Sequence, residues 1–169
     1  MRDFQSLCQE RRSYRKYTDQ PVEQEKLDYI VRCALMSPAG KRMNPWRFVV
    51  ITNQEILRQL AGCRTYGSGM FDTAMAGIVV AADTSVIDTW QCDAAIAAQN
   101  IWLAAADQGL GACWCHAYHR EGAEALVRKL TNLPENLTVL CVMSLGYKNE
   151  ERKPFDFEKL QYDKVTQID

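Results

Sequence analysis

The sequence lacks the features that would carry a chain into or through a membrane. No apolar run approaches the roughly 18 residues that span a bilayer. The first ten residues contain no apolar segment of the kind found in secretory signal peptides. The seven cysteines are an odd number, and with the missing signal they predict free thiols in a cytoplasmic protein. The glycosylation triplet at 136–138 is therefore expected to be a chance match.

An excess of charge is also missing. The chain has 20 lysines and arginines against 21 aspartates and glutamates, a net charge of −1. This balance predicts no general attraction to nucleic acid, so anion binding must come from local clusters. No repeat, low-complexity tract or long linker interrupts the chain, and its length suits a sizeable core. Residues 1–169 are therefore expected to form a single domain.

Apolar periodicity divides the chain into helices and strands. Helical spacing follows Pro21 and stops at Pro38, and Asn53 suits the N-cap of a second helix. Short continuous apolar runs indicate strands. Helices are expected at 1–10, 21–37, 53–62, 88–109 and 121–132, and strands at 46–52, 77–83, 112–118 and 138–147. This alternation predicts an α/β or α+β fold.

Two segments have unusual composition. The helix at 88–109 is crowded with alanine, and small side chains let neighbouring elements approach closely. Its polar positions are few, so it is expected to be buried on most sides. The polar tail at 148–169 is too short to be a domain and is expected to wrap over the body or over a partner subunit.

A basic cluster stands near the start of the chain. Arg11, Arg12, Ser13 and Arg15 follow the first expected helix. The planar fork of donors on arginine matches phosphate oxygens, and serine adds a short donor. The alternative is a solvated charged turn. A second basic pair, Arg152 and Lys153, follows the last strand and could complete a phosphate pocket with the first cluster.

The connection at 37–46 is rigid. Two prolines bracket Gly40 and several polar residues, and Trp46 opens a strand. A loop of this kind can lay its backbone against a flat ligand, although it could also be a plain helix-to-strand connection.

A pair of glycines, Gly109 and Gly111, raises the possibility of a dinucleotide-binding loop. The context argues against it, because the glycines follow a helix and precede a strand, and the third glycine of the fingerprint is absent.

Zinc is another possibility for this stretch, which holds Cys113, Cys115, His116 and His119. Successive strand residues point to opposite faces, so His116 is expected to point away from both cysteines. The chain has no second ligand pair with zinc-finger spacing, and no third group to orient a cysteine–histidine nucleophile. Neither a metal site nor such a nucleophile is predicted.

Taken together, four stretches resemble the nitroreductase family of flavin mononucleotide (FMN) oxidoreductases, most closely its short, often bacterial, members. They are RRSYRKYTDQPV, SPAGKRMNPWRFVVI, GLGACW and SLGYKNEERKP, in the family's order and spacing. The resemblance covers nearly the whole chain. It implies an α+β sandwich with a mostly antiparallel central sheet flanked by helices, and a homodimer with FMN at the interface. Dimerisation would also help to bury the alanine-rich helix together with a flavin ring.

The resemblance further assigns roles to residues. The first basic cluster matches the family's phosphate and ribityl segment, and the late pair lies where basic residues close the phosphate. Loop 38–40 matches the loop that reaches the flavin from the other subunit, and residues 116–117 lie near backbone N–H groups that face the ring. Arg42 replaces a frequent asparagine; with Lys41 it could favour an acidic substrate or the phosphates of NADPH, or could simply be solvated. Roles for Tyr66 and Ser68 are left open. The predicted cofactor-binding residues are Arg11, Arg12, Ser13, Arg15, Pro38, Ala39, Gly40, Arg42, His116, Ala117, Arg152 and Lys153, with no catalytic side chain and no metal ligand.

The activity that the resemblance implies is an FMN-dependent oxidoreductase that uses NAD(P)H to reduce nitroaromatics, quinones or a related small electron acceptor by a ping-pong mechanism. The alternatives are a flavin-binding protein without turnover and an enzyme of the same fold that dehalogenates or fragments flavin. A structural metal protein is a further rival.

Overall fold

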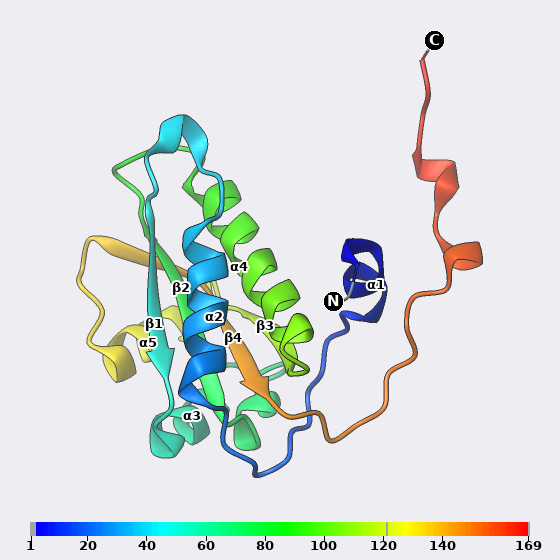
Figure 1. Cartoon of the computed structure of the whole chain (residues 1–169). Helices are drawn as coiled ribbons and strands as arrows, with labels where there is room; N and C mark the ends of the chain where they lie inside the picture. The colour runs from blue at the N-terminus through cyan, green and yellow to red at the C-terminus, as the bar shows by residue number, and fades with distance from the viewer. Residues whose placement is uncertain (1–2, 121, 169) are drawn as a thin grey trace.

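A four-stranded antiparallel sheet forms the centre of the protein (Figure 1). The computed structural model describes residues 3–120 and 122–168. The strands are β1 (Trp46–Ile51), β2 (Ala76–Asp83), β3 (Gly111–His116) and β4 (Leu137–Gly146), in the order β1-β2-β4-β3. The apolar runs of β2 and β4 are explained by this order, because the two central strands are buried almost throughout.

Helices cover both faces of the sheet. One face packs against α2 (Gln24–Leu35) and α4 (Trp90–Asp107), and the other against α3 (Gln54–Leu60) and α5 (Ala123–Thr131) (Figure 1). The described residues also form four short 3₁₀ turns: η1 (Gly40–Arg42), η2 (Gly69–Asp72), η3 (Phe157–Lys159) and η4 (Tyr162–Lys164). The expected α+β sandwich with an antiparallel sheet is confirmed. Within the part of the chain that is described, no helix has the length and apolar content needed to cross a bilayer.

Local sequence sets where the helices begin. The side chain of Asn53 accepts hydrogen bonds from the backbone N–H groups of Glu55 and Ile56, so the expected N-cap of α3 is confirmed. Asp3 caps α1 (Phe4–Glu10) in the same way through Ser6. The expected helix at 121–132 begins at Ala123; residue 121, like residues 1, 2 and 169, lies outside the described residues.

Alanine allows α4 to lie close against the sheet. Ala94, Ala97, Ala98 and Ala105 are fully buried. The opposite side of α4 is less covered than the sequence predicts, because Ile96 remains 41% exposed. The helix is thus closely packed on the sheet side and open along a strip that the chain does not cover by itself.

The two ends of the chain lie side by side and away from the sheet (Figure 1). The backbone N–H of Phe155 donates to the carbonyl of Gln9 at 2.9 Å, and the Gln9 side chain donates to the carbonyl of Phe155 at 2.8 Å. Residues 151–168, including Phe155 itself, are exposed. The tail therefore does not wrap over the body of its own chain, and its predicted contact with a partner subunit stays a prediction.

Candidate functional site

The first basic segment lies along the free edge of β3. Ser13 forms a parallel bridge with Ala112, and the backbone N–H of Tyr14 donates to the Ala112 carbonyl at 3.1 Å. The indole of Trp102, on α4, donates to the same carbonyl at 3.1 Å. A strand edge and a helix side chain thus hold the backbone of this segment in place.

Glycines in the neighbouring strands make room for two tyrosines of this segment. A Cβ atom on Gly111 would lie 2.8 Å from the Cβ of Tyr14, and one on Gly146 would lie 2.9 Å from the Cβ of Tyr17. Gly109 has φ +77° just after α4, the left-handed conformation that commonly ends a helix. Gly109 therefore ends the helix and Gly111 makes room for Tyr14. This agrees with the sequence context, which argues against a dinucleotide-binding loop.

The two predicted basic segments meet at one corner of the molecule. The guanidinium of Arg12 donates to the backbone carbonyl of Lys153 and lies 4.5 Å from the centroid of the Phe155 ring. An open pocket of about 410 Å³ adjoins this contact and is lined by Tyr14 and residues 150–154. Guanidinium and ammonium groups beside an open pocket are the donors that a phosphate requires, so the residues present fit a phosphate-bearing cofactor.

Glu150 is a member of this corner that the sequence analysis missed. One of its carboxylate oxygens accepts from the backbone N–H groups of Arg15, at 2.5 Å, and Lys16, at 3.2 Å. The other accepts from the guanidinium of Arg152 at 2.6 Å. Partial burial raises the pKa of Glu150, but the hydrogen bonds from Arg15 and Arg152 outweigh it and hold the pKa below its usual value. Glu150 thus fixes the late basic segment against the early one.

Arg11 differs from the other cations because it is packed against aromatic rings. Its guanidinium lies 4.4 Å from the ring centroid of Trp102 and 5.7 Å from that of Phe155. Burial, together with the neighbouring charge of Arg12, lowers its pKa. Arg15, by contrast, has an exposed side chain.

Loop 38–42 lies at the opposite end of α2 from the basic corner (Figure 1). Its backbone is unusual, because Lys41 and Arg42 adopt the left-handed region at φ 51° and 58°. Both side chains are exposed, and so is Pro38, whereas Ala39 and Gly40 are partly covered. A single chain therefore does not bring this loop to the basic segments.

His116 lies on β3 with its ring stacked on that of Trp114, at 6.2 Å between centroids and 16° between planes. Cys113 and Cys115 point into the core on the opposite face of the sheet, as the alternation predicts. Burial and the positive charges of Arg120 and Arg64 lower the pKa of His116. No cluster of three or more metal-ligating side chains occurs in residues 3–120 and 122–168.

Ala117 is buried, and its backbone N–H donates to the carbonyl of Leu140 at 3.0 Å. Ser68 is also buried, and its hydroxyl donates to the Ala61 carbonyl at 2.6 Å, so it has a structural role. Tyr66 is 84% exposed.

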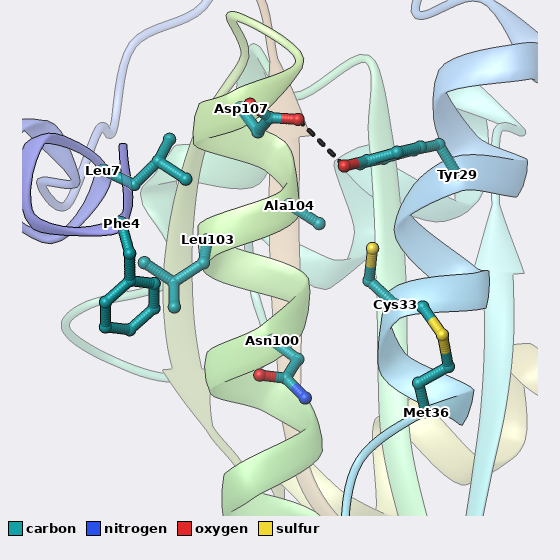
Figure 2. A pocket seen from close by; sticks show the side chains of 9 residues that line it. All are labelled: Phe4, Leu7, Tyr29, Cys33, Met36, Asn100, Leu103, Ala104 and Asp107. Atoms are coloured by element: carbon teal, nitrogen blue, oxygen red, sulfur yellow. Dashed lines mark hydrogen bonds between the residues drawn. The ribbon is translucent and has the colours of Figure 1, made fainter. Parts of the chain in front are cut away.

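A second groove, of about 410 Å³, lies between α1, α2 and α4 (Figure 2). The Tyr29 hydroxyl donates to the carboxylate of Asp107 at its upper end, at 2.9 Å. The other walls are mainly apolar and include Phe4 and Met36, both largely exposed. The groove has no cationic side chain among its lining residues, so it does not match the phosphate chemistry of the basic corner.

Comparison with known proteins gives consistent results over nearly the whole chain. The profile of the nitroreductase family matches residues 8–147. A protein of Archaeoglobus fulgidus, named provisionally as an NADH dehydrogenase/NAD(P)H nitroreductase, is 35% identical over 156 residues, covering 90% of this chain and 89% of its own. An NADPH-flavin oxidoreductase of Vibrio harveyi is 30% identical over 85% of this chain and 65% of its own. The solved structure of an FMN-dependent nitroreductase from Clostridium difficile superposes with a TM-score of 0.95 at 37% identity, covering 98% of this chain and 99% of the other.

Proposed function

The chain belongs to the nitroreductase family, and on that premise we propose that it is an FMN-dependent oxidoreductase that takes electrons from NAD(P)H and passes them to a small nitroaromatic or quinone. The observation that carries the proposal is the contact between residues 11–15 and 150–153 beside an open pocket. When bound, FMN supplies the hydride chemistry.

The cofactor's phosphate is the proposed occupant of the basic corner. Arg12, Arg15, Arg152 and Lys153 supply the positive charge, and the hydroxyl of Ser13 a further donor. A charge-assisted hydrogen bond of this kind contributes about 1.5–3 kcal/mol. Glu150 orients Arg152 and occupies the backbone N–H groups of Arg15 and Lys16, so side chains remain as the donors for the ligand.

No side chain of the protein is required as an acid or base in this proposal. His116 lies near the segment that the family resemblance directs at the flavin. Its lowered pKa keeps the imidazole neutral near pH 7, so it carries no extra proton to donate there. The two substrates would use one site in turn, which gives ping-pong kinetics.

We also propose that the active form is a homodimer. Loop 38–42 is remote from the basic corner of its own chain, so a second copy would have to bring it to the cofactor. The groove of Figure 2, with exposed Phe4 and Met36, and the open strip of α4 at Ile96 offer apolar surface for that copy. The tail at 156–169 would then have a partner surface to cover.

The decisive experiment is a titration of the apoprotein with FMN, followed by flavin fluorescence. Arg15→Ala is the cleanest variant, because Arg15 is exposed, whereas loss of Arg11 would also remove packing on Trp102. The expected loss of affinity is about ten- to hundred-fold, the equivalent of one charge-assisted bond. Arg58→Ala, an exposed arginine on α3, is the control and should bind FMN as the wild type does.

Unchanged FMN affinity in Arg15→Ala would argue against the phosphate assignment. A second measurement concerns turnover: NADH or NADPH should bleach the bound flavin, and a nitroaromatic or quinone should restore its absorption. Bound FMN that neither nucleotide reduces would contradict the proposed activity and favour a flavin-binding protein without turnover.

A further inference from the structure

Two buried cysteines outside the proposed cofactor site face each other. The sulfur atoms of Cys63 and Cys115 lie 3.9 Å apart, although 52 positions separate the residues in the chain. Cys63 follows the end of α3, and Cys115 lies on β3. The exposed fractions are 5% for Cys63 and 1% for Cys115, and both thiols are free.

The surroundings make one of these thiols acidic. The hydrogen bond between the two thiols lowers the pKa of Cys63, and Ser68 and the positive charge of Arg64 act in the same direction, against the opposing effect of burial. The same hydrogen bond, together with burial, raises the pKa of Cys115. The pKa of Cys63 thus lies below that of Cys115, so Cys63 is the thiol of the pair that ionises first.

The loop that contains Cys63 provides a route for an oxidant to its sulfur atom. Residues 61–68, between α3 and η2, form no helix or strand, and the Ser68 hydroxyl holds this loop through the carbonyls of Ala61 and Arg64. Gly67 has φ +87°, and Tyr66 projects into solvent. A loop held by a few polar contacts opens at lower cost than a strand does, so a small oxidant can reach Cys63 during such openings.

We propose that Cys63 and Cys115 are a redox-active pair that forms an intramolecular disulfide when the protein meets hydrogen peroxide. The Cys63 thiolate attacks one peroxide oxygen, the O–O bond breaks, and the leaving hydroxide takes up a proton to become water. The resulting sulfenic acid is attacked by the Cys115 sulfur, the S–S bond forms, and the hydroxyl leaves as a second water with the proton of Cys115. In sum, two thiols lose two electrons and two protons, and one peroxide becomes two waters.

The other cysteines provide an internal comparison. Cys141 is fully buried, and burial raises its pKa. Burial likewise raises the pKa of Cys113. Cys8 and Cys92 are exposed, so they could instead form disulfides between two molecules, which is the outcome that competes with the intramolecular disulfide. The disulfide between Cys63 and Cys115 would attach the loop that follows α3 covalently to edge strand β3, where the present structure has a weak thiol–thiol hydrogen bond.

The test uses the full-length protein with its cofactor, freed of reductant and treated with one equivalent of hydrogen peroxide. Remaining thiols are alkylated, and the tryptic peptides are identified by mass. Trypsin cuts at Arg58, Arg64 and Arg120, so Cys63 falls in peptide 59–64 and Cys115 in peptide 65–120. The expected product is these two peptides linked in the monomer, two thiols fewer per chain, and full reversal by dithiothreitol.

Matched variants identify the partner within peptide 65–120. Cys115→Ala should abolish the linked peptide and leave Cys63 as a sulfenic acid that dimedone traps, whereas Cys113→Ala and Cys92→Ala should keep the link. If a variant at a buried cysteine fails to fold, the peptide map of the wild-type protein still tests the proposal. Loss of thiols from Cys8 and Cys92 alone, or oxidation of Cys63 to the sulfinic acid with Cys115 still free, would overturn the proposal.

Discussion

The carboxylate of Asp93 accepts a hydrogen bond from the backbone N–H of Gly40 at 3.0 Å, and so joins the first turn of α4 to the loop after α2. Asp93 is only 4% exposed, and its second carboxylate oxygen has no hydrogen-bond partner within the described residues. The bond anchors the loop just before Lys41 and Arg42, which adopt left-handed conformations. Asp93 therefore helps to position the loop that we expect to reach the partner's cofactor.

Replacement of Asp93 by alanine should destabilise the fold. The N–H of Gly40 would lose its acceptor in a partly buried position, at a cost of about 1–3 kcal/mol in the free energy of unfolding. Urea denaturation measures it, and Asp88→Ala, an exposed aspartate just before α4, is the control that should stay within about 0.5 kcal/mol. Equal stabilities for the two variants would show that the bond to Gly40 contributes nothing.

A methyl group at position 111 should disturb the basic segment. In Gly111→Ala the new Cβ would lie 2.8 Å from the Cβ of Tyr14, too close for the backbone-proximal atoms to give way easily. We expect a loss of about 1–3 kcal/mol in stability and weaker binding of FMN, because Tyr14 precedes Arg15. Gly62→Ala is the control, since its Cβ would meet nothing nearer than 3.5 Å. Wild-type stability and affinity in Gly111→Ala would contradict the close packing.

The loss of the Tyr17 hydroxyl should be costly at neutral pH. This hydroxyl lies 2.7 Å from Oγ of Ser144 and donates to the carbonyl of Tyr14 at 2.6 Å, and all three residues are buried. In Tyr17→Phe the carbonyl of Tyr14 and the hydroxyl of Ser144 each lose a hydrogen-bond partner. This should lower the free energy of unfolding by about 1–3 kcal/mol. Tyr162→Phe, in the exposed tail, should change it by less than about 0.5 kcal/mol.

Alkaline pH tests the same residue independently. Burial raises the pKa of Tyr17 above its ordinary value of 10.0, so the folded protein keeps the proton that the unfolded chain loses. Stability from this group is therefore complete below about pH 10 and is lost as the pH rises further. Urea denaturation from pH 9 upward should show a smaller alkaline loss in Tyr17→Phe than in the wild type. Parallel profiles would mean that Tyr17 ionises normally in the folded state.

His116 should titrate below the ordinary histidine range. Burial and the charges of Arg120 and Arg64 lower its pKa, so the unfolded chain binds a proton at a higher pH than the folded protein does. Stability is then lost as the pH falls from about 6.5 toward the lower pKa. NMR titration of the ring measures this pKa directly, and Arg120→Gln should raise it. A midpoint at or above the ordinary 6.5 would contradict the expectation.

Much of the fold could be predicted because its strands are short apolar runs and its helices have amphipathic spacing. The N-cap at Asn53 is a local feature, and it was predictable for the same reason. The meeting of residues 11–15 and 150–153 depends on sheet order, which local patterns do not contain; only the family resemblance placed both segments at one phosphate. The role of Glu150 could not be predicted, because its partners Arg15 and Lys16 lie far away in the sequence.

Other features of the site are products of tertiary contact. The stacking of Arg11 on Trp102 joins positions 91 apart, so the sequence offered only a charged residue after a helix. The left-handed conformations of Lys41 and Arg42 could not be predicted from the sequence either, because neither residue type favours that conformation. The exposed strip on α4, at Ile96, was not predicted either. Apolar residues in a sequence do not by themselves show whether they lie in the core or on the surface of a single chain.

The order of strands in the sheet bears on how the protein is made. β4 is the last strand in the sequence, yet it lies between β2 and β3. Until residues 137–146 leave the ribosome, β3 has no strand to pair with and the apolar edge of β2 is open. Nascent chains that stop short of β4 therefore expose a sheet edge of the kind that aggregates, and the sheet can close only after residue 146 has been synthesised.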